Sequence, residues 1–108
     1  MNKKILITSF NENQKHINEI SNQLINLKLA SCVNLISNVK STYQWECKLQ
    51  KDNEIMMCIK TYEFNIDKIK NIIKELHDYD SPEFITLDFE IVDRKFSKWF
   101  KNQIGKAE

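Results

Sequence analysis

Hydrophobic and polar positions near the start of the chain predict a strand followed by an amphipathic helix. Lys3–Ser9 contains the continuous apolar run Ile5-Leu6-Ile7, which is typical of a short buried strand. Asn11 or Asn13 is the expected N-cap of the helix, which should end near Lys28, where a basic charge suits the helix dipole. The apolar residues of this helix recur at three- and four-residue steps and form one stripe: Ile17, Ile20, Leu24 and Leu27.

The middle of the chain changes to a two-residue period and predicts a long β-hairpin, roughly Val39 to Thr61. In Val39–Gln50 the apolar residues alternate with polar ones, as in a half-buried strand. Lys51-Asp52-Asn53 is the expected turn, with Asn53 able to take positive φ where glycine is absent. The return strand Glu54–Thr61 is apolar on both faces, so both faces should be buried. The residues expected on one face of the first strand are Val39, Tyr43, Trp45, Cys47 and Leu49.

The second half repeats the order of helix and strand. A helix over Ile66–Leu76, capped by Asn65, precedes a loop at His77–Pro82, a strand within Phe84–Val92 and a terminal helix over Arg94–Asn102. The order β-α-β-β-α-β predicts an α+β, ferredoxin-like sandwich with an extended β-hairpin and a C-terminal helix. A chain of 108 residues is expected to form one domain over residues 1–108.

The predicted hairpin is too long for its own domain to cover. Val39–Gln50 extends about 40 Å at about 3.3 Å per residue, whereas a domain of this length is only about 35 Å across. The overhang would carry Tyr43, Trp45 and Leu49 as an exposed apolar patch. We therefore expect an oligomer in which sister subunits bury the hairpin. A bulge that bends the strand back onto its own core is the alternative.

Composition limits the kinds of partner and the cellular compartment that are expected for this chain. The 16 Lys and Arg against 15 Asp and Glu leave a net charge of +1, and Arg94 is the single arginine, so nucleic acid is not an expected partner. No apolar run approaches the roughly 18 residues of a membrane span. Three cysteines without C-x-x-C spacing argue against a disulfide framework and a structural zinc site. We expect a cytoplasmic protein with free thiols, although a removed organellar leader is an open alternative.

Candidate metal chemistry gathers after the second predicted helix. His77 stands beside Asp78, Asp80 and Glu83, and imidazole with carboxylates suits Cu(II), Zn or Ni. The alternative is a histidine that balances the helix dipole beside solvated acids. Cys32 could bind Cu(I) as a thiolate, or it could be a small buried hydrophobe at the start of a core strand.

Aromatic residues favour a pocket between subunits. Apolar walls with one charged group could orient a small anion or metabolite, and the residues expected there are Tyr43, Trp45, Lys60, Tyr79 and Trp99. The alternative is interface packing with Lys60 paired to Glu83. Because no Ser-His-Asp set, glycine-rich phosphate loop or paired catalytic carboxylates occur, we do not expect an enzyme.

Four segments together resemble the CutA family of divalent-cation tolerance proteins. Leu29–Asn34 reads L-A-S-C-V-N and resembles that family's L-A-A-C-V-N, and Ser41–Lys48 is similar to its S-x-Y-x-W-x-G-K. Ile59-Lys60-Thr61 matches a strand ending in K-T, and Glu75–Glu83 is similar to L-H-P-Y-x-x-P-E. Trp99 stands where the family has a tryptophan in its last helix. The likeness spans nearly the whole chain in one order.

The resemblance implies a homotrimer whose long hairpins interlock around a threefold axis. It also implies a link to tolerance of copper and other divalent metals, with metal or a small ligand bound at the inter-subunit cleft. The expected metal-binding residues are His77, Cys32, Glu83 and Asp78. A trimeric scaffold, or a signalling module like the PII proteins, is the alternative, since no reaction is established for the family.

Some residues depart from the family pattern. Cys47 stands in place of glycine, Ser37-Asn38 in place of Pro-Gly, and Asp78 in place of proline. Some bacterial members have an extra cysteine and a second histidine as proposed copper ligands, and this chain has Ile7 and Leu76 near those places.

Overall fold

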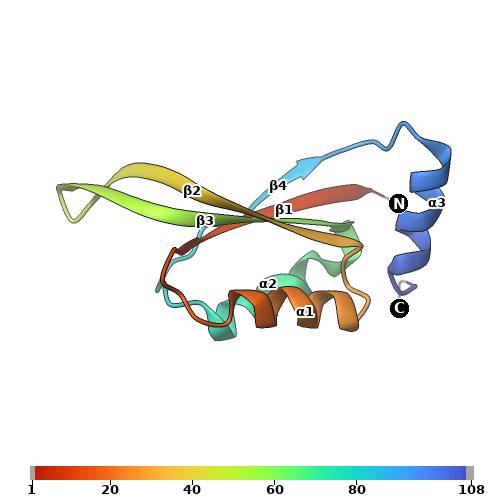
Figure 1. Cartoon of the computed structure of the whole chain (residues 1–108), viewed down its shortest axis with the longest axis horizontal. Helices are drawn as coiled ribbons and strands as arrows, with labels where there is room; N and C mark the ends of the chain where they lie inside the picture. The colour runs from red at the N-terminus through yellow and green to blue at the C-terminus, as the bar shows by residue number, and fades with distance from the viewer. Residues whose placement is uncertain (1, 107–108) are drawn as a thin grey trace.

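A computed structural model describes residues 2–106 and shows one antiparallel sheet with two helices beneath it (Figure 1). The strand order is β2-β3-β1-β4, as expected for the ferredoxin-like arrangement, so the predicted fold class is confirmed. The elements in chain order are β1 (Lys3–Asn11), α1 (Ile17–Asn26), β2 (Cys32–Trp45), β3 (Lys48–Tyr62), α2 (Ile66–Leu76), β4 (Ile85–Asp88) and α3 (Arg94–Gln103), with a short 3-10 turn, Glu63–Asn65, before α2.

The main core lies between the sheet and the two helices α1 and α2. Alternate residues of the central strands point toward the helices and are almost fully buried, as are the apolar stripes of both helices; they include Leu6, Phe10, Met57, Ile59, Ile20, Leu24, Ile69 and Ile73. A second, smaller cluster of Tyr62, Phe100 and Ile104 holds α3 at one end of the sheet. Phe89 and Ile91, which were predicted to continue the last strand, pack against this cluster instead.

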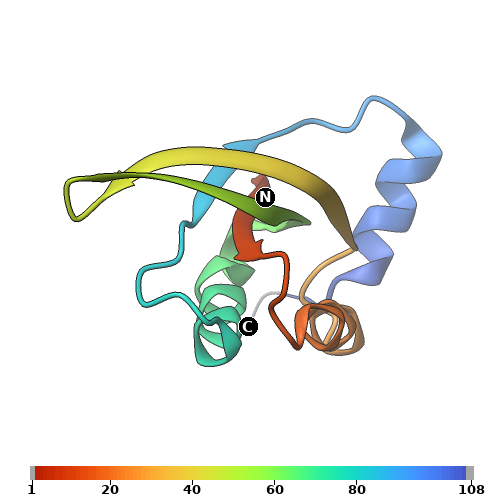
Figure 2. The same cartoon turned by 60° about the vertical axis from the view of Figure 1, so that its left-hand side comes forward.

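The opposite face of the sheet is covered by neither α1 nor α2, and Figure 2 shows this face above the helix layer. We call it the open face. The strand register places the following residues on it: Ile5, Ile7, Cys32, Asn34, Ile36, Met56, Cys58, Lys60, Ile85 and Leu87. Ile36, Ile85 and Leu87 are 49%, 47% and 52% exposed. The prediction that both faces of the return strand are buried is thus only half met, because Met56 and Cys58 are half-buried.

The predicted position of the hairpin turn was wrong. The chain turns at Glu46-Cys47, where both residues have positive φ, 51° and 63°, as a two-residue type I′ turn requires. Lys51-Asp52-Asn53 lies within β3 and pairs with Lys40–Thr42. Because the chain turns at Glu46-Cys47, the paired ladder continues to the tip of the hairpin. The added strand pairing outweighs the local turn preference of Asp52 and Asn53. Leu49 now pairs with Gln44, so it lies on the face opposite Trp45 and not beside it.

A β-bulge lies at Ser37-Asn38 of β2. The register shifts between Ile36 and Val39, and Asn38 has a φ of 62°, which an asparagine tolerates better than most residues. The bulge changes which positions of β2 face the open side, so Val39 and Tyr43 follow Ile36 on that side. The hairpin does not fold back onto the core. It extends past both helices in Figure 1, and the molecule is 46 Å long and 20 Å thin.

The predicted helix caps were partly wrong. His16, with a φ of 74°, precedes α1 in place of Asn11 or Asn13, and its side chain makes no capping bond. Asn11 instead accepts a hydrogen bond from the N–H of Asn13. At the other end Lys28, with a φ of 57°, closes a Schellman motif, and Leu27 is 54% exposed rather than part of the buried stripe.

Asn65 does precede α2 as predicted, but its side chain donates to the Leu29 carbonyl at 3.0 Å and does not cap the helix. The terminal helix is confirmed, and Asp93 caps it by accepting a hydrogen bond from the N–H of Phe96 at 2.9 Å. α3 is therefore fixed at both ends, by this cap and by the buried Ile104 that follows it.

Candidate functional site

A cavity of about 660 Å³ lies between the hairpin and the loop that follows α2. We call it the acidic cavity. Ser9 of β1 and Glu54 of β3 contribute from the sheet, and the hairpin and the loop contribute the rest. Its full lining is Ser9, Ser41, Thr42, Tyr43, Trp45, Glu54, Asp78, Tyr79, Asp80, Ser81 and Glu83.

Among the described residues, the lining of this cavity carries the carboxyl side chains of Glu54, Asp78, Asp80 and Glu83 and no side chain of Lys, Arg or His. Glu54 is only 8% exposed. Carboxylates of one sign around a partly desolvated space attract cations strongly, because the local dielectric constant is lower than that of water. The charge of the cavity therefore favours a cation over the small anion considered from the sequence.

Hydrogen bonds fix two of these carboxylates in place. The Tyr79 hydroxyl donates to Glu54 at 2.7 Å, and the Ser9 hydroxyl donates to Glu83 at 2.9 Å. Burial, together with the Glu54 carboxylate, raises the pKa of Tyr79 well above its ordinary value. Tyr79 thus remains a hydrogen-bond donor at neutral pH.

The hairpin supplies an aromatic wall. Tyr43 and Trp45 are 40% and 53% exposed, and Tyr43 donates a hydrogen bond to Asp52 on the neighbouring strand. This hydrogen bond is the main cause of a raised Tyr43 pKa. Aromatic faces beside carboxylates suit an organic cation as well as a metal ion.

Two residues predicted for the pocket between subunits, Lys60 and Trp99, lie away from the acidic cavity of a single chain. Lys60 is opposite Cys32 and Ile5, at the far end of the strands from the cavity. Trp99 is on α3, where its ring lies 5.4 Å from that of Phe96. Within one chain Lys60 and Glu83 do not pair, since Glu83 accepts a hydrogen bond from Ser9 near the other end of β1. A pair between subunits stays a prediction.

Both ring nitrogens of His77 make contacts that hold the loop in place. Its Nε2 lies 2.8 Å from the Ser9 carbonyl, and its Nδ1 accepts from the N–H of Tyr79 at 3.0 Å. The ring stacks on Phe10 at 4.4 Å between centroids. Burial lowers the pKa of His77, which favours the neutral ring that these two contacts require. Neither nitrogen is free to coordinate a metal in this arrangement.

The four predicted metal-binding residues are not brought together within one chain. Asp78 and Glu83 line the acidic cavity, His77 faces Phe10, and Cys32 begins β2 at the other end of the sheet. Among residues 2–106 no group of three or more His, Cys, Asp or Glu side chains is arranged to hold a metal ion. The residues of a single chain therefore do not fit the metal site expected from the sequence.

Gln14 and Glu54 are site residues that sequence reasoning missed. The Gln14 side chain donates to the Leu76 carbonyl at 2.9 Å and accepts from the N–H of Asp78 at 3.2 Å, so it ties the loop to the start of α1. It is buried, although it lies in a polar stretch before the helix. Glu54 could have been noticed as a lone carboxylate directly before the apolar run of the return strand.

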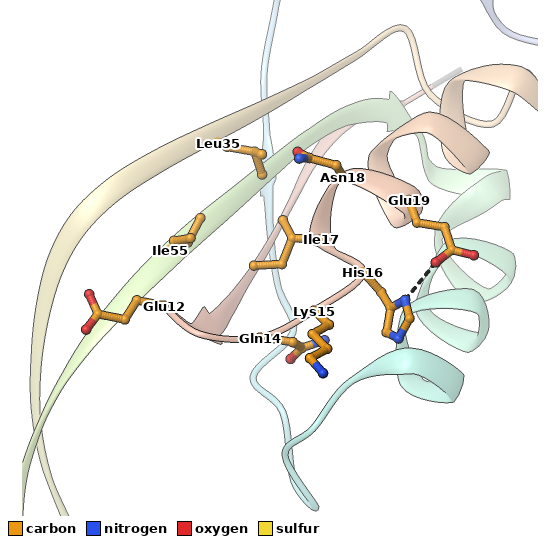
Figure 3. Close-up of a pocket in the computed structure, with 9 residues that line it drawn as sticks. All are labelled: Glu12, Gln14, Lys15, His16, Ile17, Asn18, Glu19, Leu35 and Ile55. Atoms are coloured by element: carbon orange, nitrogen blue, oxygen red, sulfur yellow. Dashed lines mark hydrogen bonds and ion pairs between the residues drawn. The ribbon is translucent and has the colours of Figure 1, made fainter.

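A second cavity, of about 510 Å³, lies at the start of α1 (Figure 3). Ile17, Leu35 and Ile55 form its apolar part, and the rim carries both acidic and basic side chains. His16 is exposed, as expected, and its Nδ1 lies 2.7 Å from Glu19. With charges of both signs, this cavity has no clear preference for a ligand.

None of the helices between residues 2 and 106 is long and apolar enough to cross a membrane.

Known proteins resemble this chain over most of its length. A family model described as CutA1 divalent ion tolerance protein matches residues 5–103. Chloroplastic protein CutA 1 of Oryza sativa is 37% identical over 82% of this chain and 50% of its own length, and protein CutA of Homo sapiens is 32% identical over 82% and 50%. This chain thus spans about half the length of these relatives.

Solved structures agree over more of the chain. A crystal structure of CutA1 from Oryza sativa has a TM-score of 0.89 at 31% identity and covers 99% of this chain and 97% of its own. CutA1 from Ehrlichia chaffeensis has a TM-score of 0.82 at 31% identity, with 94% of each chain covered. The resemblance seen in the sequence is therefore confirmed.

Proposed function

This chain belongs to the CutA1 divalent ion tolerance family, and from that premise we propose that it is a homotrimer that binds a cation at the acidic cavity. The cation would be a divalent metal ion, copper included, or a small positively charged ligand. Because the hairpin that walls the cavity is also the part that overhangs, the cavity would lie in a cleft between subunits.

The proposal rests on the four carboxyl side chains of a cavity that no basic residue lines within residues 2–106. Three of them, Asp78, Asp80 and Glu83, are exposed and available to a ligand. Since one chain holds no group of three converging ligands among its described residues, bound water or a side chain of a sister subunit would complete the coordination of a metal.

Exposed apolar surface supports the trimer. Trp45 and Leu49 near the hairpin tip are 53% and 65% exposed, and they lie on opposite faces of the hairpin. Side chains of this size on both faces are poorly explained by contact with one flat surface. A hairpin inserted between two sister subunits buries both of its faces.

Sedimentation tests the assembly. We expect the purified protein to sediment with the mass of three chains at micromolar concentration. Replacement of Trp45 and Leu49 with Arg should shift the population toward single chains, whereas Val92→Arg, at a position that is fully exposed, should not. A single-chain mass for the unaltered protein contradicts the proposed assembly.

Titration calorimetry of the native oligomer with Cu(II), Mn(II) and Mg(II) tests the site. The double variant Asp78→Asn, Glu83→Gln should bind the preferred ion at least about tenfold more weakly, because even the loss of a group that only supports a metal ligand costs about 10–100-fold. Asp67→Asn, which removes an exposed carboxylate on α2, is the matched control and should bind normally. Equal affinity in the double variant would place the ion elsewhere.

The second candidate is a non-enzymatic scaffold or PII-like signalling module that displays a partner-binding surface. The lack of a three-ligand group within residues 2–106 favours it. A trimer that binds none of the three ions, at an affinity that calorimetry detects, supports the scaffold over the metal-binding protein.

A further inference from the structure

Cys32 and Cys58 lie on the same face of adjacent strands. In the β2–β3 ladder Cys32 is opposite Lys60, and Asn34 is opposite Cys58. The two cysteines are therefore diagonal neighbours on the open face, whose strands run side by side in Figure 2. The pair is separate from the acidic cavity, because Cys32 begins β2 and the cavity lies beyond the bulge.

The spacing of the pair favours a bridging ion over a disulfide. Diagonal neighbours in an antiparallel ladder have α-carbons about 7–8 Å apart, with side chains still within reach of each other. A disulfide needs α-carbons no more than about 6.8 Å apart. Two metal–thiolate bonds of about 2.3 Å hold the sulfurs up to about 4.6 Å apart. A bridging ion therefore spans the larger α-carbon separation that a disulfide does not.

Both thiols are weakly engaged. The Cys32 sulfur has a 3.6 Å contact with the side-chain oxygen of Asn34, and Cys58 makes no hydrogen bond through its sulfur to residues 2–106. Both side chains are half-buried. Burial raises the pKa of the Cys58 thiol, and the charge of Lys60 acts against this rise.

We propose that Cys32 and Cys58 form a two-thiolate site for a soft monovalent ion, Cu(I) or Ag(I). Thiolate ligands select such ions, and linear coordination by two thiolates suits Cu(I) and Ag(I), whose d shell is filled. On binding, two S–H bonds break, two metal–sulfur bonds form and both protons pass to solvent, with no change of oxidation state.

Charge selects a monovalent over a divalent ion at this site. Two thiolates, one monovalent ion and the Lys60 ammonium sum to zero, whereas a divalent ion leaves one uncompensated positive charge. Ile5 and Ile7 of β1 stand opposite Lys60 and Cys58, so the surroundings on that side are apolar. Uncompensated charge is costly in such surroundings.

The test is a titration of the reduced native protein with Cu(I), supplied from a chromophoric chelator, and separately with Ag(I). We expect one ion per chain, and loss of this binding step in Cys32→Ser and in Cys58→Ser. The third cysteine gives the matched control, since Cys47→Ser should bind as the unaltered protein does. Asp78→Asn should also leave Cu(I) binding intact, which separates this site from the acidic cavity.

Several outcomes overturn the proposal. The proposal is wrong if the ion still binds after Cys32→Ser or Cys58→Ser. It is also wrong if binding requires Cys47, or if the unaltered protein binds no ion. If Cys58→Ser does not give the native circular dichroism spectrum, Cys58→Val replaces it. X-ray absorption of the unaltered Ag(I) protein provides a test without variants, with two sulfur neighbours expected and nitrogen or oxygen neighbours opposing the site. A Cys32–Cys58 disulfide in diamide-treated native protein would contradict the spacing argument.

Discussion

The hydroxyl of Tyr79 donates a hydrogen bond across 2.7 Å to Glu54, a carboxyl side chain that is only 8% exposed. Tyr79→Phe removes this donor and leaves a largely buried charge with one partner fewer. We expect the free energy of unfolding to fall by about 1–3 kcal/mol, the cost of a lost hydrogen bond to a charged group. Chemical denaturation at pH 7 measures it, and a change below the error of the method would show that water replaces the hydroxyl.

The same pair predicts a stability change in alkaline solution. Because folding raises the pKa of Tyr79, the folded state holds its proton more tightly than the unfolded chain does. This contribution is fully present below the unfolded tyrosine pKa of about 10 and declines as pH rises above it. Thermal unfolding from pH 8 upward should therefore show the difference between the unaltered protein and Tyr79→Phe shrinking above about pH 10. A constant difference would contradict the raised pKa.

The fold was predictable because its signals are periodic and span whole elements. A wrong boundary does not hide the helical stripe that contains Ile69 and Ile73. It also does not hide the alternation that sets Tyr43 and Trp45 on one face of a strand. The turn was not predictable in the same way. Glu46-Cys47 lacks the glycine or asparagine that normally marks positive φ, and the Asp-Asn pair that does favour a turn lies within a paired strand.

The candidate site was predictable only where sequence neighbours stay neighbours in space. Asp78, Asp80 and Glu83 belong to one loop and line one cavity. His77 belongs to the same loop, but its ring turns toward Phe10, which sequence spacing does not reveal. The pairing of Cys32 with the region of Cys58 depends on strand register, which the misplaced turn left undetermined.

The turn residue Cys47 predicts a stabilising substitution. A non-glycine residue at positive φ costs about 1–2 kcal/mol, and glycine avoids this cost but loses about 0.5–1 kcal/mol through unfolded-state entropy. Cys47→Gly should therefore raise the free energy of unfolding by about 0.5–1 kcal/mol. Cys47→Ser removes the thiol but keeps the Cβ, so it should leave stability nearly unchanged. Equal stabilisation by both changes would show that the thiol, and not the backbone, was responsible.

Two fully buried threonines provide a matched pair. Among residues 2–106 the Thr8 hydroxyl finds no hydrogen-bond partner, whereas the Thr61 hydroxyl donates to the Leu29 carbonyl at 2.6 Å. Thr8→Val should stabilise the protein by about 1 kcal/mol, and Thr61→Val should destabilise it by about the same amount. Urea denaturation of both variants checks the signs. Destabilisation by Thr8→Val would indicate that a water molecule reaches this hydroxyl.

His77 predicts a loss of stability in mildly acidic solution. Because burial lowers its pKa in the folded state, the unfolded chain binds the proton first as pH falls. The stability held above the unfolded histidine pKa of about 6.5 should therefore decline as pH falls below that value. His77→Gln lacks this proton, so its stability should change less between pH 8 and pH 5, and His16 is common to both proteins. Thermal unfolding across this range measures the difference.

The same variant also separates structure from metal binding. With both ring nitrogens engaged by Ser9 and Tyr79, His77→Gln should lower stability while Cu(II) affinity at the acidic cavity, measured on folded protein, changes little. Loss of Cu(II) binding with an unaltered pH profile would mean that the ring leaves these contacts and coordinates the ion. In that case the loop, and not only the carboxylates it carries, rearranges when the cation binds.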